Sequence, residues 1–298
     1  MKIVCIGQSA YDITLPIDGY PEENKKYKIK DKCECGGGSS NNVSYLLGLW
    51  GMNPMLVSSI GNDLYGKRIK EEQQSVNVDI TYIDEIDGVE TTTSYIINNK
   101  QNGSRTIITN KSELMHRMNN DVKIDADIIF LDGNEEETAK KIIEDNPHAI
   151  KIIDAGGYRD STIRLAKLCD YIVCSNDFAK DYSKIDFKYQ EKEKIVEAYN
   201  IIEKDFNGKL IMTLEAYGSV SKVNNEFYFI PSVKVKNVDS TGAGDIYHGA
   251  FTYFMANNYS LLEAIYYSNI AGALSVTKLG SKHSIPTLNE VINYHELW

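Results

Sequence analysis

The segment with the clearest chemical potential is Asp-Ser-Thr-Gly-Ala-Gly-Asp, at residues 239–245. Three small residues in it precede an apolar segment of helical periodicity, and they are Gly242, Ala243 and Gly244. The first N–H groups of a helix have no partner within the helix, and glycine lets main chain approach a ligand closely. The helix dipole adds positive charge at the same place. The segment therefore predicts an anion site, although a glycine-rich turn with an acidic helix cap has the same pattern.

Asp245 closes this segment, and its charge would repel a phosphate unless its task is to receive a proton. An alcohol that attacks ATP needs a base of this kind. In a loose phosphoryl-transfer transition state the hydroxyl proton leaves late, so a carboxylate within hydrogen-bond reach is basic enough. We therefore expect Asp245 to be the catalytic base of phosphoryl transfer to a hydroxyl group.

The composition excludes several classes of protein. The chain has 298 residues, with 42 acidic and 32 basic side chains and a formal charge of -10. Its basic residues form no cluster longer than the pair at 25 and 26, so nucleic acid is not an expected partner. No apolar run approaches the roughly 18 residues of a membrane span, and the amino terminus lacks the apolar stretch of a secretory signal. We therefore expect a cytoplasmic protein that binds no membrane.

The five cysteines are an odd number and do not form the pattern of a disulfide framework. We expect them to be reduced. Cys33 and Cys35 are interpreted as two small residues on one face of a strand, because no second pair or histidine cluster lies at metal-ligand spacing.

Short apolar runs alternate with helical patterns along the chain. The expected strands are residues 2–7, 55–60, 127–131, 149–154, 171–174 and 210–214, and most precede ten or more residues of helical periodicity. Nearly continuous apolar runs are typical of parallel strands covered on both faces. The pattern predicts an α/β protein, an αβα sandwich around a mostly parallel central sheet.

Two segments do not fit that scheme. Residues 14–35 are polar and rich in Lys and Glu, and residues 90–109 form two short strand-like runs around the turn signal at Asn102 and Gly103. One interpretation pairs the two segments as a small antiparallel sheet that projects from the sandwich. The other, equally compatible with the pattern, makes them unrelated surface loops.

These motifs resemble the PfkB/ribokinase family of carbohydrate kinases. Residues 239–245 are similar to its D-T-x-G-A-G-D signature, and residues 36–42 to its G-G-x-x-x-N signature before an apolar helix. The helix is indicated independently, because Val43, Leu46, Leu47 and Trp50 follow i, i+3, i+4, i+7. Further matches are residues 7–12, residues 61–66 and residues 271–287. Together they span almost the whole chain in the family's order.

The resemblance implies a single ribokinase-like kinase domain over residues 1–298, in which residues 14–35 and 90–109 form a small β-sheet lid. Unpaired strand edges of such a lid commonly become dimer contacts, so we expect a homodimer. It also implies that ATP and Mg²⁺ are used, that Asp245 is the base and that Gly242, Ala243 and Gly244 form the anion hole. Sugar hydroxyls would be held by Asp12, Gly37, Gly38 and Asn42.

The resemblance also assigns further sites. The nucleotide would contact Asn176, Thr213, Gly218, Asn269 and Gly272. Some members hold a monovalent cation beside the anion hole, which implies potassium at Asp239, Thr241, Gly280 and Ser284. A capping box from Ser260 to Glu263 should begin the helix that carries Asn269.

Two positions depart from the family pattern. Ala179 stands where a glutamate often orders the waters of Mg²⁺, and Asp177 is the nearby acid; Glu215 replaces a glycine near the nucleotide. Two alternatives to a sugar kinase stay open, and only the second of them is suggested by these departures. One is a nucleoside kinase of the same fold, with a base-stacking wall from Tyr11, Tyr20 and Tyr27, and the other is a non-catalytic sugar sensor. The particular sugar or nucleoside is not indicated by any motif.

Overall fold

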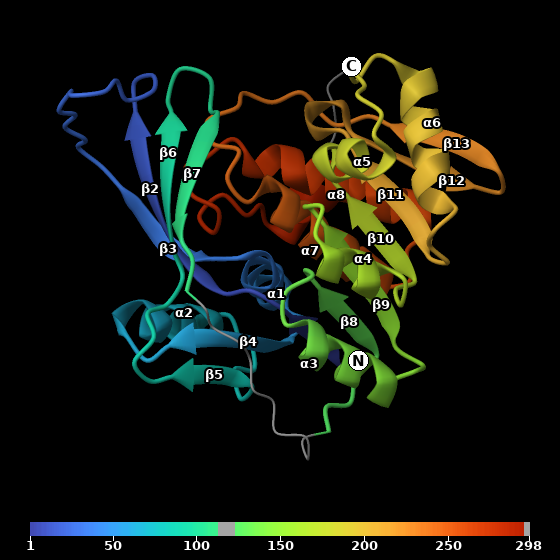
Figure 1. The fold of residues 1–298 in the computed structure, drawn as a ribbon, viewed down its shortest axis with the longest axis horizontal. Coiled ribbons are helices and arrows are strands. Elements are labelled where there is room, and N and C mark those ends of the chain that lie inside the picture. Colours follow the sequence, from blue (N-terminus) through green and yellow to red (C-terminus); the bar gives the residue numbers. More distant parts are fainter. Residues whose placement is uncertain (113–122, 295–298) are drawn as a thin grey trace.

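The computed structural model describes residues 1–112 and 123–294, in which a large and a small sheet organise the fold (Figure 1). The large sheet has nine strands in the order β13-β12-β11-β10-β9-β8-β1-β4-β5. They are β1 (Ile3–Ile6), β4 (Met55–Gly61), β5 (Ile83–Ile86), β8 (Ile128–Leu131), β9 (Ile150–Ala155), β10 (Tyr171–Cys174), β11 (Lys209–Thr213), β12 (Ser219–Val223) and β13 (Glu226–Ile230). Neighbouring strands from β5 to β11 are parallel, and β12 and β13 add an antiparallel edge. All six expected strands are confirmed.

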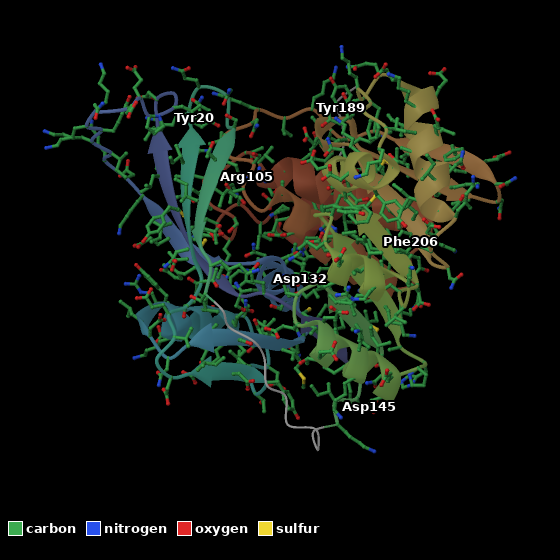
Figure 2. All side chains as sticks on the ribbon, viewed as in Figure 1. Tyr20, Arg105, Asp132, Asp145, Tyr189 and Phe206 are labelled. Carbon is green, nitrogen blue, oxygen red and sulfur yellow. The ribbon has the colours of Figure 1, made fainter. Side chains whose placement is uncertain are left out.

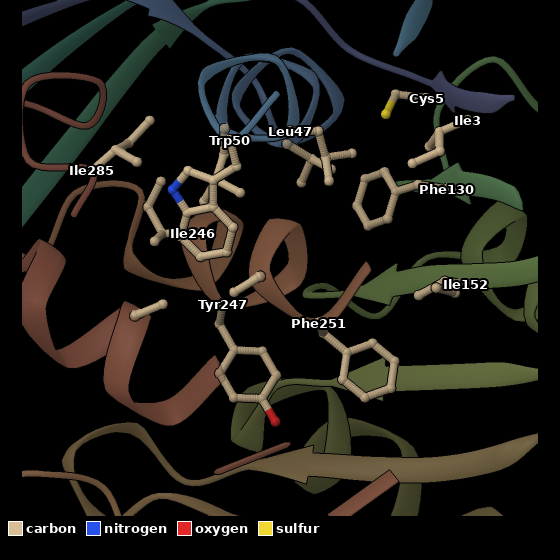
Figure 3. Packing of buried hydrophobic residues seen from close by; sticks show 14 of the residues in the cluster. Ile3, Cys5, Leu47, Trp50, Phe130, Ile152, Ile246, Tyr247, Phe251 and Ile285 are labelled. Atoms are coloured by element: carbon tan, nitrogen blue, oxygen red, sulfur yellow. The ribbon is translucent and has the colours of Figure 1, made fainter. Parts of the chain in front are cut away.

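Helices cover both faces of the large sheet, which confirms the αβα sandwich. Alternate residues of β1 enter two different hydrophobic clusters, Ile3 and Cys5 in one and Val4 and Ile6 in the other. The first cluster includes residues of α1 (Ser39–Leu49), α2 (Leu64–Ser75), α7 (Ala243–Ala256), α8 (Leu261–Ser275) and α9 (Leu288–Ile292). The second includes residues of α3 (Glu136–Asp145), α4 (Asp160–Ala166), α5 (Asn176–Ser183) and α6 (Lys192–Glu203). Figure 3 shows the first cluster, where Leu47 of α1 and Phe251 of α7 pack against strand residues such as Phe130.

The small sheet has the order β3-β2-β6-β7 and projects from the large sheet (Figure 1). Its strands are β2 (Ala10–Ile17), β3 (Cys33–Gly37), β6 (Thr93–Asn99) and β7 (Arg105–Asn110). The two unusual segments therefore pair with each other, but the expected antiparallel arrangement is wrong at the centre, because β2 and β6 are parallel. β2 follows β1 and β6 follows β5 along the chain. Because β1 and β5 are parallel strands of the large sheet, the chain enters the small sheet twice from strands that run in the same direction.

Several local expectations are confirmed. Cys33 and Cys35 lie on β3 and share one face of the strand, since they are two residues apart. Ser260 and Glu263 form the capping box that begins α8. Within residues 1–112 and 123–294, no helix combines the length and the apolar character that crossing a bilayer requires.

Candidate active site

The loop before α7 brings main chain into the expected anion site. Gly242 is the N-cap of α7, and its φ of 77° lies in the left-handed region that favours glycine. A Cβ at Gly242 would lie 2.6 Å from the Cβ of Ser281, so space also requires glycine there. A Cβ at Gly244 would have no atom within 4 Å, which leaves this face of the loop open. The Ala243 N–H donates to the Ser240 carbonyl at 3.3 Å, so an anion would be bound by the N–H groups of Gly244 and Asp245.

Asp245 lies in the first turn of α7, beside that open face. The Nδ2 group of Asn42, on α1, donates a hydrogen bond of 2.7 Å to Asp245 Oδ2. Burial raises the pKa of the Asp245 carboxyl group, and the charge of Asp154 raises it further. Asn42, His248 and Ser39 act in the opposite direction. Asp245 is thus a stronger base than an exposed aspartate.

Asp12 lies on β2 and faces the same region. Its side chain is 8% exposed, and burial raises its pKa to about 7, with further contributions from Cys35 and Asp245. Gly37 is necessary for this placement, because a Cβ at residue 37 would lie 2.1 Å from Asp12 Oδ2. Gly38 has a φ of 92°, and a Cβ there would lie 2.4 Å from the Gln8 carbonyl oxygen. The two glycines let β3 and the start of α1 close around the carboxylate.

The residues expected to contact a nucleotide lie around the carboxyl ends of β10 and β11 and on α8. Asn176 donates to the hydroxyl of Tyr189 at 2.6 Å, and Thr213 donates to the Cys174 carbonyl at 3.2 Å. The Asn269 amide accepts from Ser219 at 2.8 Å and donates to the Ile230 carbonyl at 3.1 Å, so it fixes the β12–β13 edge.

Two glycines complete this set. Gly218 has a φ of 98°, which favours glycine, and a Cβ there would lie 2.1 Å from the Ile230 carbonyl oxygen. On α8, a Cβ at Gly272 would lie 3.4 Å from the Ala243 carbonyl oxygen. Gly272 therefore lets α8 pack closely against the start of α7.

The two departures from the family pattern have structural consequences. Ala179 is fully buried in the second hydrophobic cluster, so position 179 supplies no carboxylate to the site. Glu215 is exposed and has a φ of 51°, in the left-handed region where glycine is favoured. Beside it, Tyr189 and Tyr217 stack with ring centres 4.7 Å apart. Tyr189 is labelled in Figure 2.

The four residues expected at a cation site form one contiguous cluster. Asp239, only 1% exposed, accepts from the Thr241 N–H and hydroxyl at 3.0 and 2.7 Å and from the Gly280 N–H at 2.9 Å. The Ser284 N–H donates to the Gly280 carbonyl at 3.1 Å. Asp239 therefore joins the loop before α7 to the loop that follows α8. From the small sheet, Arg105 on β7 donates to the Ser240 carbonyl at 2.9 Å (Figure 2).

Four side chains of the site were not singled out by sequence reasoning. Asp154, at the carboxyl end of β9, accepts from the Ser39 hydroxyl at 2.5 Å, and its Oδ1 lies 3.4 Å from His248 Nε2. Lys282 is 6% exposed, and its Nζ lies 2.6 Å from Glu72 Oε2. The available signal for Asp154 was its place at the end of a buried strand, because ligands bind beyond the carboxyl ends of parallel strands.

Comparison with known proteins identifies the family. The sequence profile of the "pfkB family carbohydrate kinase" matches residues 1–288. Ribokinase of Dictyostelium discoideum is 24% identical over 97% of this chain and 99% of its own, and a nucleoside kinase of Methanocaldococcus jannaschii is 21% identical over 98% and 95%. The structure of Arabidopsis thaliana ribokinase complexed with ribose and ATP covers 99% of both chains, with a TM-score of 0.76 and 18% identity. The chain therefore belongs to the pfkB family of carbohydrate kinases, phosphotransferases that act on hydroxyl groups of sugars.

Proposed function

We propose that this protein transfers the terminal phosphoryl group of ATP to a hydroxyl group of an uncharged sugar, with Asp245 as the general base. The observation that carries the proposal is the position of Asp245, at the start of α7 beside the open face of Gly244 and fixed by Asn42. This position supports the proposal, because transfer to an alcohol requires a base next to an anion site.

The proposed reaction follows from these positions. Asp12 and Asn42 orient the sugar, and the acceptor hydroxyl donates its proton to Asp245 as its oxygen forms a bond to the γ-phosphorus. The bond between that phosphorus and the β–γ bridging oxygen breaks, and ADP leaves. The N–H groups at the start of α7 stabilise the charge on the transferring group.

ATP and Mg²⁺ fit the residues that are present. The loop of Gly242, Ala243 and Gly244 offers main-chain donors to phosphate, and Asn176, Thr213 and Gly218 lie at the carboxyl ends of neighbouring strands. Within residues 1–112 and 123–294, no three His, Cys, Asp or Glu side chains gather as a metal site. Mg²⁺ would therefore be held mainly by the phosphates, as is usual for this ion, and would neutralise part of their charge.

Potassium at Asp239, Thr241, Gly280 and Ser284 remains part of the proposal, supported by their contiguity. Turnover in potassium salts, compared with tetramethylammonium salts of equal ionic strength, tests it. Equal rates in the two salts would exclude a specific potassium requirement.

The charges around Asp12 support an uncharged acceptor. Asp12 and Asp245 raise each other's cost of ionisation, as the contribution of Asp245 to the Asp12 pKa indicates. Lys282 favours ionised Asp12, but its Nζ is already paired with Glu72 at 2.6 Å. A phosphate or carboxylate on the acceptor would meet two negative groups and no free cation among these residues, whereas hydroxyl groups can donate to both carboxylates.

A nucleoside acceptor has less support. Tyr11 is 2% exposed, and its ring stacks on Tyr65 with centres 4.5 Å apart, so it is not free to stack on a base. Tyr20 and Tyr27 are exposed and lie in the loop between β2 and β3.

The proposal also includes a homodimer formed through the small sheet. All six residues of β7 are exposed, and the apolar Ile107 and Ile108 are among them. A strand edge of this kind with apolar side chains is a common site of association between copies.

The test is to measure ADP release with ATP and a panel of uncharged sugars, sugar phosphates and nucleosides. Turnover on uncharged sugars supports the proposal, turnover on nucleosides alone supports the nucleoside kinase, and binding without turnover supports a sensor. Asp245→Asn should fold and bind sugar but lose turnover by about a hundredfold or more. Asp160→Asn, in the exposed first turn of α4, is the matched control and should keep it. Near-normal turnover of Asp245→Asn would refute the mechanism.

A further inference from the structure

Asp154 is a second buried carboxylate beside the proposed base. It lies near the carboxyl end of β9 and is 8% exposed. Its Oδ2 accepts from the Ser39 hydroxyl at 2.5 Å, and the same hydroxyl lies close enough to Asp245 to lower the pKa of its carboxyl group. Ser39 therefore connects the two carboxylates, although β9 and α7 are far apart in the sequence.

His248 completes this arrangement from the second turn of α7. Its side chain is 6% exposed, and Nδ1 lies 2.6 Å from the Gly244 carbonyl oxygen. A carbonyl only accepts, so Nδ1 carries a proton. On the other side of the ring, Nε2 lies 3.4 Å from both the Val173 carbonyl oxygen and Asp154 Oδ1. Both ring nitrogens thus face acceptor oxygens, and the ring joins Asp154 of β9 to the first turn of α7.

We propose that Asp154 and His248 form a positioning pair for Asp245, an inference that rests on the proposed function. Asp154 holds Ser39 against the base and, by its negative charge, strengthens Asp245 as a proton acceptor. His248 lies between Asp154 and the first turn of α7, and its Nδ1–H donates to the Gly244 carbonyl, which fixes the peptide unit that carries the Asp245 N–H. Neither residue is proposed to touch the sugar.

The charges that face Asp245 come from three elements. Asp154 lies on β9, His248 on α7 and Asp12 on β2, while α1 contributes the neutral Asn42 and Ser39. The Asp154 charge raises the pKa of Asp245 more than His248 lowers it. Loss of the Asp154 charge should therefore lower the pKa of Asp245 and weaken it as a base.

The first experiment is the pH profile of kcat for Asp154→Asn and Asp154→Glu, with ATP and a sugar that the wild-type protein phosphorylates. Asparagine has nearly the shape of aspartate and can still accept from the Ser39 hydroxyl, so the variant should fold. We expect the acidic limb of the profile to move to lower pH in Asp154→Asn, with a kcat about tenfold lower and an unchanged KM for sugar. Asp154→Glu keeps the charge and should leave the limb near its wild-type position.

The second experiment observes the ring nitrogens of His248 directly and does not depend on turnover. Nitrogen-15 NMR of the imidazole rings, with His248→Gln to assign the signal, should show a proton on Nδ1 of His248 in the wild-type protein, as the contact with the Gly244 carbonyl requires. The Nε2 signal should change in Asp154→Asn, because Nε2 lies 3.4 Å from Asp154 Oδ1. An unmoved acidic limb in Asp154→Asn, or a His248 ring without a proton on Nδ1 in the wild-type protein, would overturn the inference. Loss of the proposed function itself would be recognised separately, because Asp245→Asn would then retain turnover.

Discussion

Asp12→Asn should make the protein more stable while it removes sugar binding. The Asp12 carboxyl group is 8% exposed, and burial together with Cys35 and Asp245 raises its pKa from 3.8 to about 7. The nearest compensating cation, Lys282, is already paired with Glu72. Ionisation of Asp12 therefore lowers the stability of the folded protein at neutral pH. Asparagine does not ionise, so the variant would not lose this stability.

The size and sign of this effect follow from the pKa shift. Between pH 4 and pH 7 the folded state binds more protons at Asp12 than the unfolded state does, so the free energy of unfolding falls as the pH rises. A shift of about 3 pH units, at about 1.4 kcal/mol for each, corresponds to a cost on the order of 4 kcal/mol above pH 7. Asp12→Asn and the wild-type protein should be similar near pH 4, and the variant should be more stable at pH 8.

The assay is urea unfolding of both proteins at pH 4, 6 and 8, followed by circular dichroism. Asp132→Asn is the matched control, because this carboxylate is also buried but accepts from the N–H groups of Gln8, Ser40 and Asn134 and from the Asn134 side chain. It should be destabilised at every pH, since an amide nitrogen would face an N–H donor. The reasoning is refuted if Asp12→Asn is no more stable than the wild-type protein at pH 8, or if the difference does not depend on pH.

The raised pKa of Asp12 also predicts how sugar affinity depends on pH. Hydroxyl groups that donate to Asp12 favour its ionised form, so sugar affinity in the wild-type protein should increase as the pH rises through 7. Calorimetric titration at pH 6 and pH 8 would measure this increase, and Asp12→Asn should not show it. If both outcomes are observed, Asp12 lowers stability in order to bind substrate, a compromise that is common in active sites.

Three further predictions concern other positions. Gly37→Ala should raise the KM for sugar at least tenfold, because the new Cβ would overlap the Asp12 carboxylate; Gly157→Ala, where a Cβ has free space, should not. Glu215→Gly should be about 1 kcal/mol more stable than Glu215→Ala in urea unfolding, because only glycine relieves the positive φ, and equal stabilities would contradict this. Ile108→Lys, on exposed β7, should convert a dimer into a monomer in sedimentation, whereas a monomeric wild-type protein would exclude the interface.

The parallel strands could be predicted from sequence because their pattern is local. Runs such as those of β1 and β8 are apolar on both faces, and each is buried from both sides in the structure. The pairing of β2 with β6 could not be predicted in the same way. Its parallel direction depends on where β1 and β5 end in the large sheet, which no short window of sequence contains.

The residues of the candidate site likewise fall into those that a local sequence pattern indicates and those that only the fold brings together. Asp245, Asn42 and Gly37 belong to motifs, so their types and spacing alone indicate chemistry, and the fold brings Asn42 within 2.7 Å of Asp245. Asp154 lies near the end of an ordinary buried strand, and His248 occupies an ordinary helical position. Their significance arises only when β9 ends beside the first turns of α1 and α7.

Three carboxylates from three separate elements therefore converge on one small region. Asp12 comes from β2, Asp154 from β9 and Asp245 from α7, and the ionised form of Asp12 and of Asp245 is disfavoured by burial. Such convergence opposes folding, and the chain offsets it locally with donors from Asn42, Ser39 and Ser94 and with the cations of His248 and Lys282. The arrangement is explained if these oxygens are completed by ligand hydroxyl groups, which donate without adding charge. An acceptor that carried its own negative charge would increase the same repulsion, which is the reason that the proposed acceptor is an uncharged sugar.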